Sequence, residues 1–153
     1  MNSVIRIFLA ISLMPLSWLM AEDLKVKVSE QTFTKPAAWK SEKTASKMRA
    51  AQFSVPGKVG EASAECVFFY FGPGAGGGAQ ANLQRWVGQF ARDPKPEFKV
   101  DDAKVGDTPV AFLFANGTFM DGPPFGGAKV PKKNYGMAAA VLGTKPGYIF
   151  VKM

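Results

Sequence analysis

The sequence predicts an α+β fold, in which a mostly antiparallel sheet of about five to seven strands is packed by one clear helix. The first observation is a series of short alternating or apolar segments separated by turns, in a chain with 16 glycines and 11 prolines. The second is one helical stripe, because Leu83, Trp86, Val87 and Phe90 follow the spacing i, i+3, i+4 and i+7. The third is the length of 153 residues, which suits a single ordinary domain.

The first 21 residues have the composition of a signal peptide. Residues 1–6 carry a positive charge, residues 7–20 form an almost wholly apolar core, and Ala21 precedes two acidic residues. Because a membrane-spanning helix needs about 20 apolar residues, this core is too short for an ordinary span. We therefore expect cleavage after Ala21, export to the periplasm or the extracellular space, and one domain over residues 22–153 without a transmembrane span. An uncleaved anchor is the alternative.

Three strands are expected before the glycine-rich segment. Residues 24–28 alternate, residues 48–55 alternate until a Pro-Gly turn, and residues 62–71 are apolar on both faces. The last pattern is typical of a central strand, which is buried on both sides. Residues 40–47 are polar and are expected to form a loop.

A glycine-rich segment, GPGAGGG at residues 72–78, links the third strand to the helix expected over residues 79–90. It formally fits the G-x-G-x-x-G pattern of dinucleotide-binding turns, which also lie between a strand and a helix. The segments that follow favour antiparallel hairpins over a second βαβ unit, and the Gly-Lys-Ser/Thr of a P-loop is absent. Two roles remain open: the amides at the helix start bind an anion, or the glycines only form an adaptable corner.

The second half of the chain predicts two hairpins separated by a long loop. Residues 98–104 and 109–119 form the first hairpin, and residues 135–142 and 148–153 form the second. The loop covers residues 121–133, which are rich in proline and glycine. The second strand of the first hairpin carries an alternating set, Val110, Phe112 and Phe114.

The composition argues against an enzyme. The chain contains no histidine and one cysteine, Cys66, which excludes imidazole bases and thiolate metal cages. Cys66 lies in an apolar run and is expected to be a buried, inert thiol. Asp101, Asp102 and Asp107 are the densest acidic cluster, but the first two would face opposite sides of a strand. We expect no metal and no cofactor; a carboxylate-based hydrolase at this cluster is kept as a third hypothesis.

Four motifs carry a resemblance to a known group of proteins. They are Pro36-Ala-Ala-Trp39, Met48-Arg49-x-Ala51-x-Phe53-x-Val55, Gly76-Gly77 with Ala81-Asn82-x-x-Arg85-Trp86-x-x-Gln89-Phe90, and Gly117-Thr118. Through them, residues 33–153 resemble uncharacterised exported bacterial domains that are distantly similar to the PsbP-like fold. The resemblance implies an antiparallel sheet flanked by helices, in binding or assembly subunits rather than enzymes. It also implies a closing helix after the last strand, which the sequence up to Met153 lacks. We therefore expect a fragment, a shortened member, or a partner that covers the exposed sheet.

The predicted function is that of an exported, non-catalytic binding or assembly domain with an unidentified protein or envelope partner. Loss of residues 1–21 removes Arg6 and no acidic residue, so the mature chain keeps a net charge of about +6, which favours acidic partners. Nucleic acid is not expected as a partner, because the protein is exported and its lysines form no dense run. The alternative is a binder of a small anionic ligand. In it, Arg49 and Arg85 supply bidentate donors to the ligand, unless they form structural ion pairs instead. Its candidate ligand-binding residues are Arg49, Gly76, Gly77, Gly78, Asn82 and Arg85.

Overall fold

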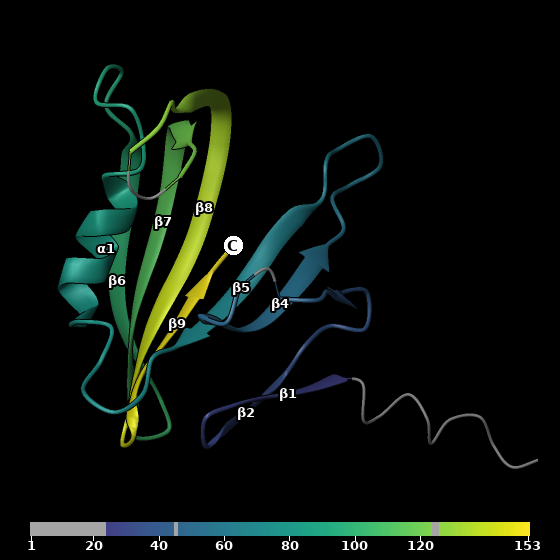
Figure 1. Ribbon diagram of the computed structural model, residues 1–153, viewed down its shortest axis with the longest axis vertical. Coiled ribbons are helices and arrows are strands. Elements are labelled where there is room, and N and C mark those ends of the chain that lie inside the picture. The colour runs from purple at the N-terminus through teal and green to yellow at the C-terminus, as the bar shows by residue number, and fades with distance from the viewer. Residues whose placement is uncertain (1–23, 45, 124–125) are drawn as a thin grey trace, which may run out of the picture.

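The computed structural model describes residues 24–44, 46–123 and 126–153 (Figure 1). The predicted signal peptide, residues 1–21, lies outside the described residues. Nine strands and one α-helix occur in the described part of the chain. In chain order they are β1 (Lys25–Val28), β2 (Gln31–Thr34), β3 (Lys40–Ser41), β4 (Arg49–Val55), β5 (Ala64–Tyr70), α1 (Ala79–Val87), β6 (Glu97–Val105), β7 (Thr108–Asp121), β8 (Val130–Thr144) and β9 (Gly147–Lys152).

Seven of these strands form one antiparallel sheet in the order β3-β4-β5-β9-β8-β7-β6, and β1 and β2 form a separate hairpin. The predicted α+β class, with a mostly antiparallel sheet and one helix, is therefore confirmed. The last strand in the sequence, β9, lies in the middle of the sheet between β5 and β8. This insertion joins the two halves of the chain and leaves β6 and β3 as the two sheet edges.

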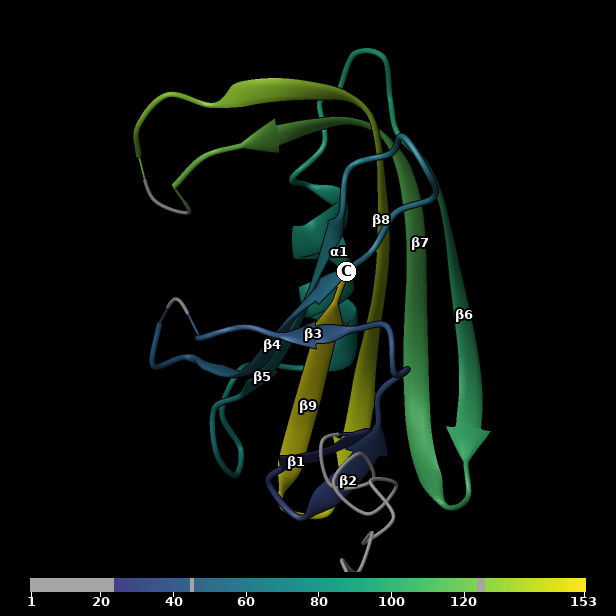
Figure 2. The same ribbon diagram turned by 90° about the vertical axis from the view of Figure 1, so that its right-hand side faces the viewer.

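Each face of the large sheet is packed by a different element (Figures 1 and 2). On the helix face, Leu83, Trp86 and Phe90 pack against residues that include Leu113 of β7 and Phe150 of β9. The ring of Trp86 meets that of Phe150 edge-on at 6.5 Å between centroids. Full burial of each such side chain contributes roughly 1.5–3 kcal/mol, so the predicted helical stripe fixes α1 on the sheet.

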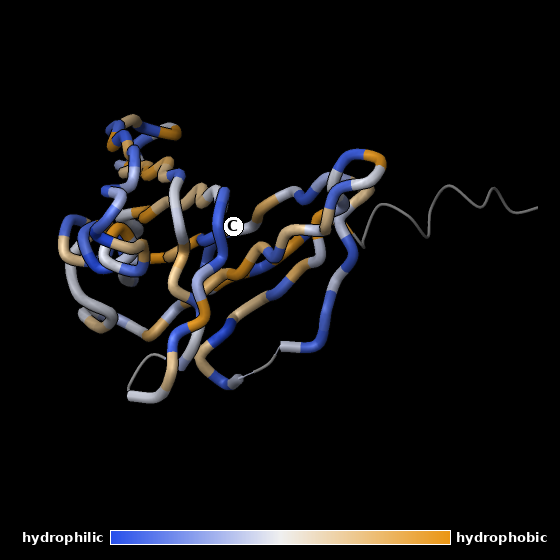
Figure 3. Tube along the Cα trace, turned by 90° about the horizontal axis from the view of Figure 1, so that it is seen from above, coloured by the Kyte–Doolittle hydropathy of each residue, from blue (hydrophilic) through white to orange (hydrophobic). Residues whose placement is uncertain are grey.

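On the hairpin face, Val28 of β1 and Phe33 of β2 pack against β4, β5 and β9. The ring of Phe68 lies between those of Phe33 and Phe53, with centroid distances of 5.0 Å and 6.0 Å. Cys66 belongs to this core and is 2% exposed, as predicted. Burial and the neighbouring Glu65 raise the pKa of its thiol to about 11. Figure 3 shows hydrophobic and hydrophilic parts of the chain interleaved along the strands.

The helix expected over residues 79–90 ends at Val87, and Phe90 lies beyond it in a bridge to Phe119. Three strand segments also differ from the prediction. The sequence predicts no strand over Gln31–Thr34, which forms β2, and predicts a loop where Lys40–Ser41 forms β3. The predicted loop over residues 121–133 is shorter, because β8 already begins at Val130 and pairs with the end of β7. In each case the strand is determined by its pairing partner more than by its own side chains.

The alternating residues of β7, Val110, Phe112 and Phe114, do not form the face that packs on the helix. Leu113, which is 0% exposed, and Ala115 contact the helix, while Phe112 and Phe114 lie on the other face of β7. Phe114 is exposed, because the β1–β2 hairpin packs against β4, β5 and β9 and not against this part of the sheet.

The far ends of β7 and β8 bend sharply away from the rest of the sheet (Figure 2). The bend coincides with a register shift between Gly117 and Phe119. Beyond it, residues 118–120 run beside residues 89–91, with the Ala91 N–H donating to the Thr118 carbonyl at 2.8 Å. The rings of Phe90 and Phe119 meet edge-on at 5.6 Å between centroids. The bent ends therefore cover the chain that leaves α1.

Candidate functional site

The glycine-rich segment is tied to α1 by the side chain of Asn82. The Asn82 amide nitrogen donates to the Gly76 carbonyl at 2.8 Å and to the Gly78 carbonyl at 3.0 Å. Asn82 is 4% exposed, and Gly77, with a φ of 78°, lies directly beside this amide. The contacts of this loop to Asn82 are therefore made by its carbonyl groups.

Arg85 is joined to the same network from the solvent side. Its guanidinium donates to the Asn82 side-chain oxygen at 3.0 Å, and the rest of this arginine is exposed. The structure thus brings together four of the six candidate ligand-binding residues, Gly76, Gly78, Asn82 and Arg85, in one chain of hydrogen bonds, with Gly77 next to it.

Arg49 belongs to a different network on β4 and β5. Its guanidinium donates to the Gln52 side chain at 2.9 Å and forms an ion pair with Glu65 at 2.8 Å. Gln52 also donates to the Glu65 carboxylate at 2.8 Å. Arg49 and Arg85 share no hydrogen-bond partner within the described ranges. Arg49 has the structural ion pair that the sequence left open as its other role.

The three aspartates of the acidic cluster do not meet in one cleft. Asp101 forms an ion pair with Lys99 at 2.7 Å, while the adjacent Asp102 points to the helix face, where it lines a cavity. Asp107 lies in the turn between β6 and β7. In the part of the chain that the structure describes, no cluster of three carboxylate or cysteine side chains could hold a metal ion.

The structure has a groove beside α1 that the sequence did not reveal. A cavity of about 560 Å³ lies between α1 and β6, and its walls are largely apolar. Leu83 and Val87 of α1 form one side, and Phe98 and Val100 of β6 form the other. Because it joins a helix to an edge strand, we call it the α1–β6 groove.

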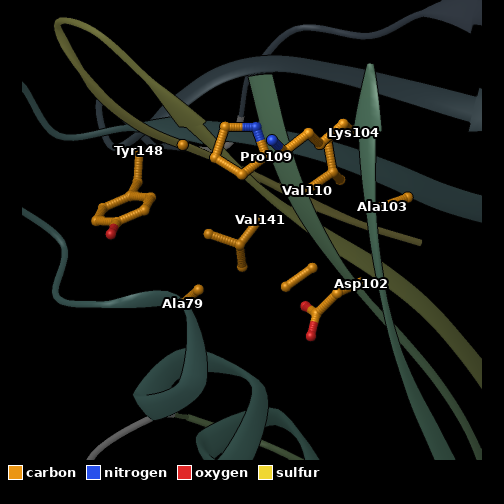
Figure 4. A pocket seen from close by; sticks show the side chains of 10 residues that line it. Ala79, Asp102, Ala103, Lys104, Pro109, Val110, Val141 and Tyr148 are labelled. Carbon is orange, nitrogen blue, oxygen red and sulfur yellow. The ribbon is translucent and has the colours of Figure 1, made fainter. Parts of the chain in front are cut away.

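A second cavity, of about 510 Å³, continues this groove past the start of α1 (Figure 4). The two cavities share Ala79, Asp102 and Ala111. The second one extends to Lys104 of β6 and to Tyr148 of β9. Figure 4 shows the Asp102 carboxylate pointing from β6 toward Ala79, into the space between strand and helix. A carboxylate therefore lies where the two cavities meet.

The outer edge of β6 borders the groove. Among the described residues β6 pairs only with β7, so alternate backbone N–H and C=O groups over Glu97–Val105 point away from the sheet and have no strand there to bind. Phe98 and Val100 are 48% and 45% exposed, although both are apolar and both line the groove. The site thus offers unpaired backbone groups beside an apolar cavity.

Lys152, near the end of β9, forms a separate polar cluster. Its ammonium group donates to the Gln89 side chain and lies 5.1 Å from the centre of the Phe119 ring. Burial lowers the pKa of Lys152 to about 8; the charge of Glu65 opposes this shift and that of Arg49 adds to it. The cluster joins β9 to the bent end of β7 and to the segment after α1.

Comparison with family models, curated proteins and solved structures found no match to the chain. Across the described ranges, no helix has the length and hydropathy needed to cross a bilayer.

Proposed function

We propose that this chain is a non-catalytic binding or assembly domain, and that it binds its partner through the α1–β6 groove and the β6 edge. The proposal includes export of the protein to the periplasm or the extracellular space. It also includes a distant relation to PsbP-like domains.

The observation that carries the proposal is the combination of an exposed edge strand with an apolar cavity. Edge strands are templates for pairing, and proteins commonly cover them or shorten them. The other edge of this sheet, β3, has two residues, whereas β6 has nine and exposes Phe98 and Val100 beside the groove. Exposed apolar residues next to a concave surface are typical of interaction sites.

Site-specific photocrosslinking in cells of the native host tests the proposal. A benzophenone amino acid in place of Phe98 should give an adduct of one discrete mass, and Val100→Glu in the same chain should abolish it. The control position is Val59, which is fully exposed in the turn between β4 and β5. Absence of an adduct at position 98, or the same adducts from both positions, would overturn the proposal.

A small anionic ligand at the glycine-rich segment is the second candidate. It is supported by the exposed Arg85 guanidinium, which Asn82 holds beside the loop. Inorganic phosphate should then raise the melting temperature of the wild-type chain but not that of Arg85→Ala, while Arg49→Ala tests whether the second arginine takes part. No shift, or a shift that persists in Arg85→Ala, would eliminate this candidate.

A further inference from the structure

We infer that the partner of the α1–β6 groove is an extended segment of another protein, which adds to β6 as an antiparallel strand. Its side chains facing α1 are apolar at two alternate positions and basic at the next. The inference rests on the proposed function and specifies the chemistry of the partner at that same site.

The backbone of β6 is suited to receive a strand. Each outward N–H and C=O of Glu97–Val105 can pair with a segment lying alongside, and such pairing supplies affinity without regard to sequence. Specificity then comes from side chains at alternate positions, which point to the same face as their neighbours on β6. Addition of an extended segment to an exposed sheet edge is one recurrent mode of peptide recognition.

The side chains of β6 on the helix face define what the added strand must present. Phe98, Val100 and Asp102 occupy successive alternate positions and all line the groove. In an antiparallel pair, residues directly opposite one another have side chains about 5 Å apart. Apolar side chains opposite Phe98 and Val100 would enter the cavity between these residues and α1.

Charge determines the third position. Asp102 makes no ion pair within the described ranges, and the other polar side chains that line the cavity beside Phe98 are Gln80 and Gln84, which are neutral. A lysine or arginine of the partner opposite Asp102 would compensate its charge. Lys104 occupies the next position on this face of β6, and its charge disfavours a second basic residue of the partner opposite it.

A second copy of this chain fits less well. Antiparallel β6–β6 registers centred on Val100, Asp101 or Asp102 would place Phe98, Val100 or Asp102 of the second copy opposite Asp102. An apolar or acidic residue would then face the carboxylate, which leaves its charge uncompensated. Lys104 comes opposite Asp102 in the register centred on Ala103, which pairs only residues 101–105 and leaves Phe98 and Val100 with no residue opposite. The partner is therefore a different sequence.

Selection of random peptides displayed on phage, with the full chain as target, tests the inference. The selected peptides should share two apolar residues and one lysine or arginine, at three successive alternate positions. One N-methyl group on a peptide amide that faces β6 should abolish binding, whereas methylation of an amide that faces solvent should not, and the bound peptide should slow amide hydrogen exchange in β6.

A charge exchange provides the second readout. Asp102→Lys should weaken binding of the selected peptide about tenfold or more, and a peptide with glutamate in place of the basic residue should restore it. The matched control is Asp101→Lys, which lies on the opposite face of the same strand and should leave binding within about twofold. Circular dichroism of both variants confirms that they fold.

The outcomes separate the inference from the proposed function. Peptides that depend on Val100 but show neither alternation nor a response to Asp102→Lys overturn the strand inference and leave the groove as a binding surface. If no selected peptide is lost in Val100→Glu, both proposals fail. If the chain instead dimerises and Val100→Glu dissociates the dimer, the second copy is the occupant and the inference is wrong.

Discussion

Asn82 is the one buried polar side chain among the described residues, and both ends of its amide are used. A buried polar group favours folding only when it is hydrogen-bonded, and removing its partner leaves an unsatisfied group. Here the partners are the carbonyls of Gly76 and Gly78, in a loop that has no other side-chain hydrogen bond to α1 within the described ranges. Asn82 therefore has a clear structural role, which does not depend on any ligand.

Asn82→Asp tests this role, because the carboxylate keeps an acceptor for Arg85 but loses both donors to the loop. We expect the free energy of unfolding to fall by about 1–3 kcal/mol, measured by urea denaturation. Arg85→Ala is the control: it removes only the exposed end of the network and should cost less than about 0.5 kcal/mol. Equal effects of the two substitutions would show that the loop does not depend on the amide.

Lys152 should make the stability depend on pH in the alkaline range. Its pKa is about 8 in the folded protein, mainly because of burial, against an ordinary value of 10.5. Between these values the unfolded chain binds more protons than the folded one, so stability rises with pH. Below about pH 8 both states are charged, and the cost of burying the charge is fully present.

We expect this rise to be on the order of 1–2 kcal/mol between pH 8 and 10.5, because one pKa unit corresponds to about 1.4 kcal/mol and solvent reduces the effect at a half-buried side chain. The measurement is the difference in unfolding free energy between the wild type and Lys152→Met across that range. Other groups titrate in both proteins and cancel in the difference. A difference that stays constant with pH would contradict the effect of burial.

The glycine-rich segment is hydrogen-bonded to α1, and the reason why a glycine is needed differs between its positions. Gly76 has a φ of 85°, and a Cβ there would lie 2.7 Å from ring atoms of both Phe71 and Phe150. Gly74 has a φ of 68°, with no atom within 4 Å of the corresponding position. The first needs glycine for conformation and for close packing, the second for conformation alone.

Gly76→Ala should therefore cost more than Gly74→Ala. A left-handed conformation costs a non-glycine residue roughly 1–2 kcal/mol, which both variants share. Overpacking against Phe71 and Phe150 should add about 1–3 kcal/mol in Gly76→Ala only. Thermal unfolding of the two variants measures the difference; if it is absent, the contact with the two rings relaxes without cost.

The elements that could be predicted were those whose own side chains repeat with a clear period. The alternation of residues 48–55 predicted β4, and the stripe from Leu83 to Phe90 predicted α1. By contrast, β2 contains a single apolar residue, Phe33, and turns at Ser29 with a φ of 54°, where the sequence has no glycine. Its pairing with β1 and its packing on β5 determine the strand.

The candidate site depended on information that no local pattern contains. Phe98 and Val100 alternate visibly, but their exposure follows from the position of β6 at the sheet edge. That position follows from the insertion of β9 between β5 and β8, a pairing between residues far apart in sequence. In the same way, the pairing of Arg49 with Glu65 needs the register of β4 and β5.

At the scale of the whole molecule, two hydrophobic cores lie on opposite faces of one sheet and share its strands. Leu83, Trp86 and Phe150 belong to the core on the helix face, while Phe53 and Ile149 belong to the core on the hairpin face. Adjacent residues of β9, both essentially fully buried, thus contribute to different cores. Detachment of β9 would therefore expose both cores at once.

This arrangement predicts one cooperative unfolding transition, which two tryptophans can report. Trp86 belongs to the helix-face core and Trp39 packs against the hairpin-face core. Variants that retain only Trp39 or only Trp86, each with Trp18 also replaced by Phe, should be compared by fluorescence in urea. After correction for the stability change that each substitution causes, both should give the same midpoint and slope, because coincident transitions indicate two-state unfolding. An earlier transition at Trp39 would mean that the β1–β2 hairpin and its core unfold independently, and that β9 does not couple the two faces.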